Sequence, residues 1–257
     1  MKWPASFTIV RHGQSEYNVL RAKKEASTLY QEFKKSFEQD PECERTHRLA
    51  LEVQNEFALG TSDYETRLTE EGMHQARETG KKLSTLIAVP NVVFVSPYLR
   101  TRNTFECIAE EWPALADVKI VYDDRIREQE HGLSLLYNDR RVFHALHPEQ
   151  RKLFELMGPY WYRYPQGESV SDTRDREREF AGMLIREYSE ADVLAITHHL
   201  TILSTRANHE RLTPEQFIHL DENHKPVNCG VTNYIGNPYA GSNGKLELEF
   251  YNKQLWE

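Results

Sequence analysis

The sequence has little of what marks proteins that work in membranes, on nucleic acids or outside the cell. No apolar run in its 257 residues approaches the length needed to span a bilayer. Basic residues are outnumbered by acidic ones, 32 to 40, which disfavours general binding to nucleic acids or anionic membranes. No signal-peptide pattern precedes the first apolar run. We therefore expect a cytoplasmic protein that binds neither nucleic acid nor membrane.

Cysteine is also scarce, and no metal-binding pattern is present. Cys43, Cys107 and Cys229 are far apart and follow no spacing rule, which is typical of reduced thiols rather than a disulfide framework. The pair His144 and His147 lacks the glutamate that accompanies histidines in helical zinc sites, and we interpret it as a surface helix end. We expect no metal and no cofactor.

Short apolar runs alternate with amphipathic helical segments along most of the chain. The runs Phe7–Val10, Val92–Val95 and Val193–Thr197 predict buried strands. Helical patterns lie between them, for example from Leu99 to Glu111, which Pro113 ends. This interleaving predicts an α/β fold, a three-layer α/β/α arrangement with a mostly parallel central sheet.

Residues 19–66 interrupt the alternation. Apolar residues recur there at every fourth position in two stretches separated by Asp40-Pro41, namely Leu29, Phe33 and Phe37, then Leu49, Val53 and Phe57. The spacing predicts two amphipathic helices joined by a turn, a helical hairpin inserted into a single 257-residue domain. The hairpin follows the first strand directly, so it could cover a pocket or shape substrate choice. An inert insertion packed on the sheet edge would fit the sequence equally well. A dimer contact is the third option.

The segment FTIVRHGQSEYN, residues 7–18, places a histidine between an arginine and a glycine at the end of a predicted strand. Open α/β sheets bind their ligands at the carboxyl ends of strands, and Gly13 permits the tight turn that ends this one. Arg11 could bind phosphate oxygens through its planar fork, and His12 could attack a phosphorus atom. An ordinary solvent-exposed histidine fits this tripeptide as well.

Two further predicted strands end in similar residues. The Val193 run ends at His198-His199, and the Val92 run is followed by SPYLR, which contains Arg100. Parallel strands would bring Arg11, His12, Arg100 and His198 to one sheet edge. The result would be a cationic anion-binding cluster on a chain of formal net charge -8. His198 alone could be a satisfied core histidine, and His199 is the alternative functional member of its pair.

Six segments resemble, in order, the successive motifs of the histidine phosphatase superfamily, the phosphoglycerate mutase-like family. They are IVRHGQSEYN, LTEEGMHQA (68–76), SPYLRTRNT (96–104), the Glu128 segment IREQEHG, YRYPQGES (162–169) and AITHH (195–199). The resemblance runs from residue 7 to about 234, and YRYPQGES is also similar to the bisphosphatase domain of fructose-2,6-bisphosphatase. It implies the phosphoglycerate mutase-like fold and metal-independent phosphoryl transfer.

The resemblance also implies catalytic roles. His12 would attack phosphorus as a neutral imidazole whose other nitrogen is fixed by a backbone carbonyl. Arg11, Arg100 and His198 would hold the non-bridging oxygens. Glu128 matches the position of the family's general acid, and the nearby Glu130 is an alternative.

Further residues are candidates for binding the substrate. Those are Gln14, Ser15, Asn18, Tyr162, Arg163 and His199. Tyr162 and Arg163 could equally be a packing aromatic and a surface arginine.

Residues 132–158 show no counterpart of the basic, proline-containing segment with which the mutases hold a bisphosphate. Hydrolysis is therefore favoured over isomerisation. We expect a phosphomonoesterase that acts on a small phosphorylated metabolite through a phosphohistidine, and that could be a homodimer. The alternatives are a phosphoglycerate mutase and a weakly active module that binds phosphate or phosphopeptides.

Overall fold

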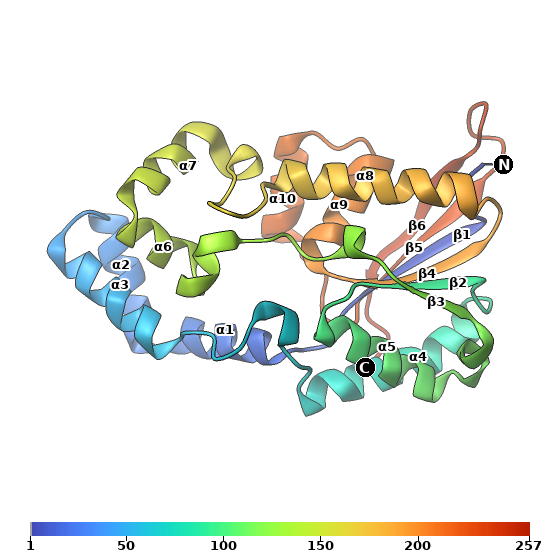
Figure 1. The fold of residues 1–257 in the computed structure, drawn as a ribbon, viewed down its shortest axis with the longest axis horizontal. Helices are drawn as coiled ribbons and strands as arrows, with labels where there is room; N and C mark the ends of the chain where they lie inside the picture. The colour runs from blue at the N-terminus through green and yellow to red at the C-terminus, as the bar shows by residue number, and fades with distance from the viewer. Residues whose placement is uncertain (1) are drawn as a thin grey trace. The chain divides into compact units, whose positions relative to one another are not determined.

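The computed structural model describes residues 2–257 and divides into two compact units (Figure 1). The first, called here the sheet unit, contains the chain up to Ser15 together with Tyr64–Glu128 and Asp172–Glu257. The second, called here the helical unit, contains Glu16–Asp63 and Gln129–Ser171. No helix among the described residues is long and apolar enough to cross a membrane.

The sheet unit is built on one mixed sheet. Among residues 2–257 the strands are β1 (Ser6–Arg11), β2 (Val92–Val95), β3 (Lys119–Tyr122), β4 (Asp192–Thr197), β5 (Val231–Asn237) and β6 (Lys245–Lys253). Their order in the sheet is β3-β2-β4-β1-β5-β6. The first four of these positions run parallel, while β5 and β6 are antiparallel to their neighbours. The predicted α/β class with a mostly parallel sheet is confirmed.

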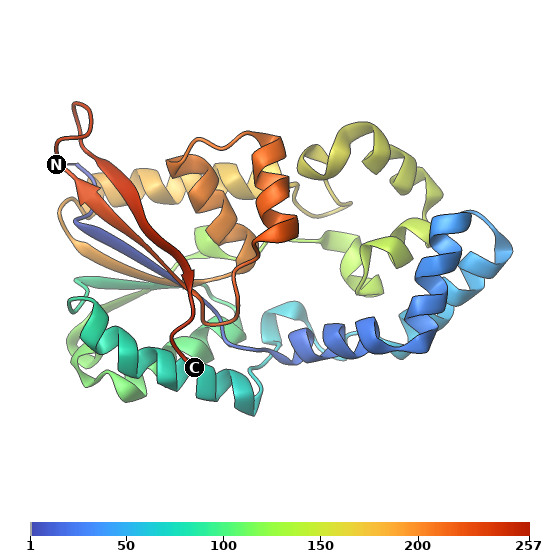
Figure 2. The ribbon, with the colours of Figure 1, turned by 180° about the vertical axis from the view of Figure 1, so that it is seen from behind.

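Helices cover both faces of this sheet, as Figure 1 shows. They are α4 (Glu70–Leu86) and α5 (Leu99–Glu111) on one face and α8 (Val170–Glu187) and α9 (His199–His209) on the other, with α10 (Pro214–Asn223) beside α9. From behind, α9 and α10, in orange, lie on the same side of the sheet as α8 (Figure 2). Short 3-10 turns span Asp63–Glu65, Pro113–Asp117 and Asp124–Ile126.

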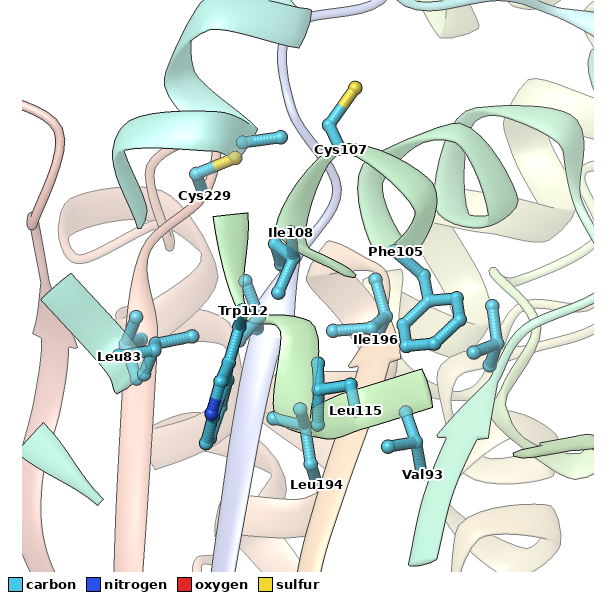
Figure 3. Close-up of a cluster of buried hydrophobic side chains, with 14 of the residues drawn as sticks. Leu83, Val93, Phe105, Cys107, Ile108, Trp112, Leu115, Leu194, Ile196 and Cys229 are labelled. Atoms are coloured by element: carbon cyan, nitrogen blue, oxygen red, sulfur yellow. The ribbon is translucent and has the colours of Figure 1, made fainter. Parts of the chain in front are cut away.

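Alternate strand residues face opposite layers, which gives the sheet unit two cores. Val93, Leu194 and Ile196 pack against α4 and α5 (Figure 3), whereas Phe94 and Ala195 pack against α8. Both faces are apolar because a parallel sheet is buried on both sides. This explains why the strands appear in the sequence as continuous apolar runs rather than alternating ones.

The helix starts follow from capping chemistry. The Thr69 hydroxyl accepts the backbone N–H of Gly72 at the start of α4. Thr213 and Gln216 form a complete capping box with Pro214 at the first position of α10. Each cap satisfies backbone donors that the first turn of a helix leaves unpaired.

The helical unit consists of two chain segments. The first carries α1 (Glu16–Ala26), α2 (Thr28–Gln39) and α3 (Glu44–Glu56), and the second carries a 3-10 turn (Gly132–Tyr137), α6 (Arg140–Leu146) and α7 (Pro148–Trp161). Their common core includes Phe33, Val53 and Val142. The two helices predicted from the sequence lie close to the positions of α2 and α3. The sequence did not predict that the second segment belongs to the same unit. A role of residues 19–66 as a lid stays a prediction.

One interpretation of the helical unit was wrong. His144 is not at a surface helix end, because its side chain is buried among Phe143, Phe154 and Tyr162. Burial lowers the pKa of His144 to about 4, with Arg140 and Arg151 adding to the effect. The apolar neighbours come from α6 and α7, which the sequence did not predict.

Candidate active site

His12 lies immediately after β1, where the strand ends. Its backbone N–H donates to the carbonyl of Thr197 on β4 at 2.9 Å, and its side chain is 3 % exposed. The ring atom Nδ1 is 2.8 Å from the carbonyl oxygen of Gly13. A carbonyl oxygen can only accept a hydrogen bond, so Nδ1 carries the proton. Nε2 is therefore the nitrogen with the lone pair, as a nucleophile requires.

The turn after His12 is held against the start of α4 by contacts between two backbones. The N–H of Thr69 donates to the carbonyl of Gln14 at 3.0 Å. A Cβ on Gly13 would meet the carbonyl oxygen of Gly72 at 2.5 Å, and a Cβ on Gly72 would overlap the carbonyl of Gln14. The two glycines are therefore required by close approach. This explains why the RHG and LT-x-x-G motifs occur together in one sequence.

His198 follows β4 in the same way, and its side chain is fully buried. Its ring centroid is 5.3 Å from that of His12, and its Nε2 is 2.7 Å from the hydroxyl of Ser96 at the end of β2. Among the described residues, Nδ1 of His198 has no hydrogen-bond partner. A buried polar atom without a partner is costly, and at this sheet edge an anion could supply the missing acceptor or donor.

Two arginines act on these histidines. Arg100 lies in the first turn of α5, is buried, and its guanidinium is 4.8 Å from the ring centroid of Tyr98. Arg11, at the end of β1, donates through Nη1 to the carbonyl of Pro226 at 2.7 Å. The pKa of His12 is held well below 6.5 by burial, then by Arg100 and Arg11. Burial is therefore the larger cause, and the two arginines add to it.

The same causes lower the pKa of His198. Burial comes first, followed by Arg100 and by His12 itself. Both imidazoles are consequently neutral near pH 7 in the absence of an anion. The strand-end residues Arg11, His12 and His198 thus come together with Arg100 in the sheet unit, at the carboxyl ends of neighbouring parallel strands.

Glu128 is fixed at the start of α9. Its Oε1 accepts the backbone N–H of Leu200 at 3.1 Å, in the helix turn that directly follows His198. Helix N-termini favour a carboxylate. Glu130, the alternative acid, belongs to the helical unit and is exposed. Its backbone N–H donates to the carboxylate of Glu168 at 3.1 Å. The structure thus places Glu128 beside the helix turn that follows His198, and its role as the acid stays a prediction.

Three substrate-binding candidates lie in the sheet unit. Oε1 of Gln14 accepts the Thr69 hydroxyl at 2.8 Å, and Ser15 is fully buried and forms an isolated β-bridge with Leu68. These contacts give Gln14 and Ser15 a part in holding the loop against α4. His199 is the first residue of α9, and its Nε2 lies 2.8 Å from Oδ1 of Asp221 on α10.

The other three candidates lie in the helical unit. Tyr162 is 1 % exposed, and its hydroxyl donates to Oε1 of Gln150 at 2.9 Å. This favours packing over substrate contact for Tyr162. Arg163 is exposed and Asn18 lies in the first turn of α1, and their roles stay predictions.

Several residues around the histidines were missed in the sequence. The carbonyl of His12 accepts Nδ2 of Asn228 at 3.1 Å and the N–H of Cys229 at 3.3 Å, and Thr104 accepts the N–H of Gly13 at 3.0 Å. Ser96 could have been found, because it directly follows β2. Asn228 precedes an antiparallel strand, for which the strand-end rule gives no signal.

Among the described residues, no group of three or more histidine, cysteine, aspartate or glutamate side chains is arranged to hold a metal ion.

Comparison with known proteins identifies the class to which this fold and site belong. Residues 53–236 match the model of the histidine phosphatase superfamily (branch 1), and the chain belongs to this superfamily. The matched range begins after the RHG segment, so the position of His12 depends on its motif and its geometry.

The sequence relatives carry mutase names. The chain is 32 % identical over 161 residues to the phosphoglycerate mutase-like protein AT74H of Arabidopsis thaliana, covering 55 % of each chain. It is 30 % identical over 161 residues to the probable phosphoglycerate mutase GpmB of Erwinia tasmaniensis, covering 59 % of this chain and 69 % of that one. The chain spans about half the length of its Arabidopsis relatives.

Solved structures share the fold at low identity. A mycobacterial glucosyl-3-phosphoglycerate phosphatase with inorganic phosphate has a TM-score of 0.64 at 16 % identity, over 98 % of this chain and 99 % of that one. Phosphoserine phosphatase from Entamoeba histolytica, in complex with 3-phosphoglyceric acid, has a TM-score of 0.63 at 15 % identity, over 98 % of both chains. At these identities the likeness extends to the fold alone.

Proposed function

We propose that the protein is a phosphomonoesterase that hydrolyses a small phosphorylated metabolite through a phosphohistidine on His12. The observation that carries the proposal is the hydrogen bond from Nδ1 of His12 to the carbonyl of Gly13. It leaves Nε2 unprotonated in a ring whose pKa is already lowered by burial and by Arg100 and Arg11. A neutral imidazole beside two guanidinium groups suits attack on a phosphate dianion.

In the first step, Nε2 of His12 attacks phosphorus and the bond from phosphorus to the ester oxygen breaks. Arg11, Arg100 and His198 stabilise the charge on the non-bridging oxygens, which positions the group without a metal ion. The leaving alkoxide takes a proton from the carboxyl of Glu128. The alcohol departs, leaving phosphorylated His12 and a Glu128 carboxylate.

In the second step, the Glu128 carboxylate removes a proton from water as the water attacks phosphorus. The bond from Nε2 to phosphorus breaks, and inorganic phosphate leaves. Glu128 regains its proton and His12 returns to its neutral state, so the cycle consumes one ester and one water. The contact of Oε1 with the Leu200 N–H at 3.1 Å holds the Glu128 carboxyl at the start of α9 in both steps.

The proposal is tested with 4-nitrophenyl phosphate in the presence of a metal chelator. We expect release of phosphate that survives chelation, is blocked by vanadate, and falls at least ~10⁴-fold in His12→Ala. Rapid-quench trapping with ³²P-labelled substrate should show an acid-labile label on the wild-type protein and none on this variant.

His144→Leu is the matched control, because His144 is also buried with a lowered pKa but belongs to the helical-unit core. It should keep the label and the activity. A requirement for added Mg²⁺, or an acid-stable label, would rule out the phosphohistidine route. Binding of phosphate without turnover would instead support the phosphate-binding module.

A phosphoglycerate mutase is the second candidate, and the mutase names of the sequence relatives favour it. A mutase would interconvert 2- and 3-phosphoglycerate in the presence of 2,3-bisphosphoglycerate, with little phosphate released. Release of phosphate at the rate of ester consumption would exclude it. The phosphatase neighbours act on small phosphorylated metabolites by name, which supports the substrate class but no particular compound.

The resemblance of residues 162–169 to fructose-2,6-bisphosphatase does not identify the substrate. Tyr162 of that segment is buried and its hydroxyl is bonded to Gln150. Fructose 2,6-bisphosphate is therefore one compound to include in a substrate screen rather than the proposed substrate.

A further inference from the structure

The segment that carries Glu128 has no regular backbone pairing. After the 3-10 turn at Asp124–Ile126, the chain passes through Arg127 and Glu128 without entering a helix or strand. Buried carbonyl groups that lack secondary structure need donors from elsewhere. The donors that reach these carbonyls therefore determine where the Glu128 carboxyl lies.

Arg176 of α8 supplies donors to three of these carbonyls. Its Nη1 donates to the carbonyl of Arg125 at 2.7 Å and to that of Arg127 at 3.0 Å. Its Nη2 lies 3.3 Å from the carbonyl of Glu128. One planar guanidinium thus contacts three carbonyls within four consecutive residues. Because the guanidinium fork is rigid, these contacts fix the curvature of the segment as well as its distance from α8.

Two threonines donate to carbonyls of the same segment from the side of β4 and α9. The hydroxyl of Thr197 donates to the carbonyl of Ile126 at 2.6 Å, and that of Thr201 donates to the carbonyl of Arg127 at 2.6 Å. Thr197 directly precedes His198. The segment is therefore held from α8 on one side and from the strand and helix that flank His198 on the other.

We propose that Arg176 is a positioning residue that holds Glu128 in place to protonate the leaving group. The inference rests on the proposed role of Glu128 as the acid. A shift of about 1 Å in a catalytic group can cost ~10²-fold in rate. Loss of Arg176 would remove one donor from each of three carbonyls, of which that of Arg127 keeps the Thr201 hydroxyl, and would let the Glu128 backbone move. His12, immediately after β1, keeps its own contacts.

The chain contains a matched control two residues away on the same helix. Arg174 also spans three oxygens, but they lie near the other end of α9. It contacts the Asn208 side chain at 2.9 Å and the carbonyls of Leu212 and Ala207 at 3.0 and 2.8 Å. Loss of Arg174 should destabilise the protein without moving Glu128.

The test compares two esters that share a nitrophenyl ring and differ in leaving group. 4-Nitrophenyl phosphate needs little protonation on leaving, whereas 4-nitrobenzyl phosphate releases an alkoxide that does. The parameter is kcat/KM, which reports only the steps up to release of the alcohol. We expect Arg176→Met to lower it about 100-fold for the benzyl ester and less than tenfold for the phenyl ester.

The conservative variant Arg176→Lys and the control Arg174→Met should each differ from Arg176→Met in how kcat/KM changes for the two esters. Arg176→Lys keeps the charge and one donor nitrogen but loses the planar fork, so it should restore part of the benzyl activity and stay folded if Arg176→Met does not. Arg174→Met should change both esters by the same factor. Equal loss on both esters in the Arg176 variants, or the same selectivity in Arg174→Met, would overturn the proposal.

Glu128→Gln, measured in parallel, separates this inference from the proposed function. It should show the same preference for the phenyl ester, with a larger loss on the benzyl ester. If Glu128→Gln is not selective, the acid assignment itself is wrong. If it is selective and Arg176→Met is not, the acid stands and the positioning role of Arg176 falls.

Discussion

The two compact units bury charged side chains in opposite ways. In the sheet unit, Arg100 lies beside His12 and His198, and these groups of one sign lower the pKa of both histidines after burial itself. In the helical unit, Nζ of Lys24 is 2.9 Å from Oδ2 of Asp139, with side chains 3 % and 9 % exposed. Burial alone would raise the pKa of Asp139, but Lys24 holds it below its usual value.

The difference separates a structural network from a binding site. The helical-unit network combines opposite charges, and the Tyr30 hydroxyl donates to Asp139 at 2.5 Å while Lys24 also donates to the carbonyl of Asn138. It links α1 and α2 of the first segment to the start of α6 in the second. The sheet-unit cluster combines the positive charges of Arg11 and Arg100 with two histidines whose pKa they lower, and an arriving anion would stabilise it.

The largest effect is expected in the helical unit. Asp139→Ala would leave Lys24 buried without its carboxylate and remove the N-cap of α6, where Asp139 accepts the N–H groups of Arg141 and Val142. We expect a loss of about 3–5 kcal/mol in the free energy of unfolding. The measurement is urea denaturation followed by circular dichroism.

The comparison is sharpened by a double variant and a surface control. Lys24→Met with Asp139→Leu removes both charges and should recover much of the loss. Asp175→Ala breaks an exposed pair with Arg178 on α8 and should cost less than ~1 kcal/mol. If Asp139→Ala cost no more than this control, the network would not hold the two segments together.

In the sheet unit the same kind of change should act on function. Arg100→Met should reduce kcat/KM about 10²- to 10³-fold and weaken inhibition by vanadate. It also removes a charge that lowers the pKa of His12, so that pKa should rise toward 6.5. The acid limb of the profile of kcat/KM against pH should then shift to higher pH, and NMR titration of the ring protons would report the same shift.

Stability provides the contrast between the two variants. Arg100→Met should lower the free energy of unfolding less than Asp139→Ala does, because Asp139→Ala leaves the buried Lys24 without its carboxylate. A larger loss of stability for Arg100→Met, with vanadate binding intact, would mean that Arg100 serves the fold rather than the anion.

Much of the sheet unit was predictable from the sequence, because strand-end positions are a local signal. Arg11, His12 and His198 follow apolar runs, and the register of β1 against β4 pairs Arg11 with Thr197, which brings the residues after both strands together. The order of the parallel strands accounts for Arg100, because β2, which precedes it, lies beside β4. Glu128 was assigned from its motif, and its contact with the Leu200 N–H could not be foreseen, since the two are 72 residues apart.

The helical unit was less predictable. The spacing of Phe33 and Val53 indicated two helices, but the Lys24 to Asp139 pair joins residues far apart in sequence. Neither residue carries a local sign of burial. Lysine and aspartate on amphipathic segments are usually solvated, so a buried pair of them appears only when the partner segment is placed.

Glu177 of α8 is a third buried ionisable side chain, and it extends the comparison. Its hydrogen bonds come from neutral groups. Nδ2 of Asn208 donates to its Oε2, and burial raises the pKa of Glu177 to about 7. For Asp139 burial also raises the pKa, but Lys24 together with the hydrogen bonds from Tyr30 and Val142 outweighs it and lowers the pKa. Burial raises the pKa of both acids, and the opposite signs of their shifts follow from how far their partners offset it.

Glu177 should consequently make the sheet unit less stable as the pH rises. The fold holds the proton up to a pKa of about 7, whereas the unfolded chain releases it near the ordinary value of 4.5. The contribution to stability is complete below pH 4.5 and is lost as the pH rises to about 7, by up to about 3 kcal/mol. Glu177→Gln keeps the acceptor for Asn208 and cannot ionise, so its stability relative to wild type should increase between pH 5 and 7.5, as measured by urea denaturation. Glu179→Gln on the exposed face of α8 should show no such trend, and a flat difference for Glu177→Gln would mean that the buried carboxyl is ionised at neutral pH.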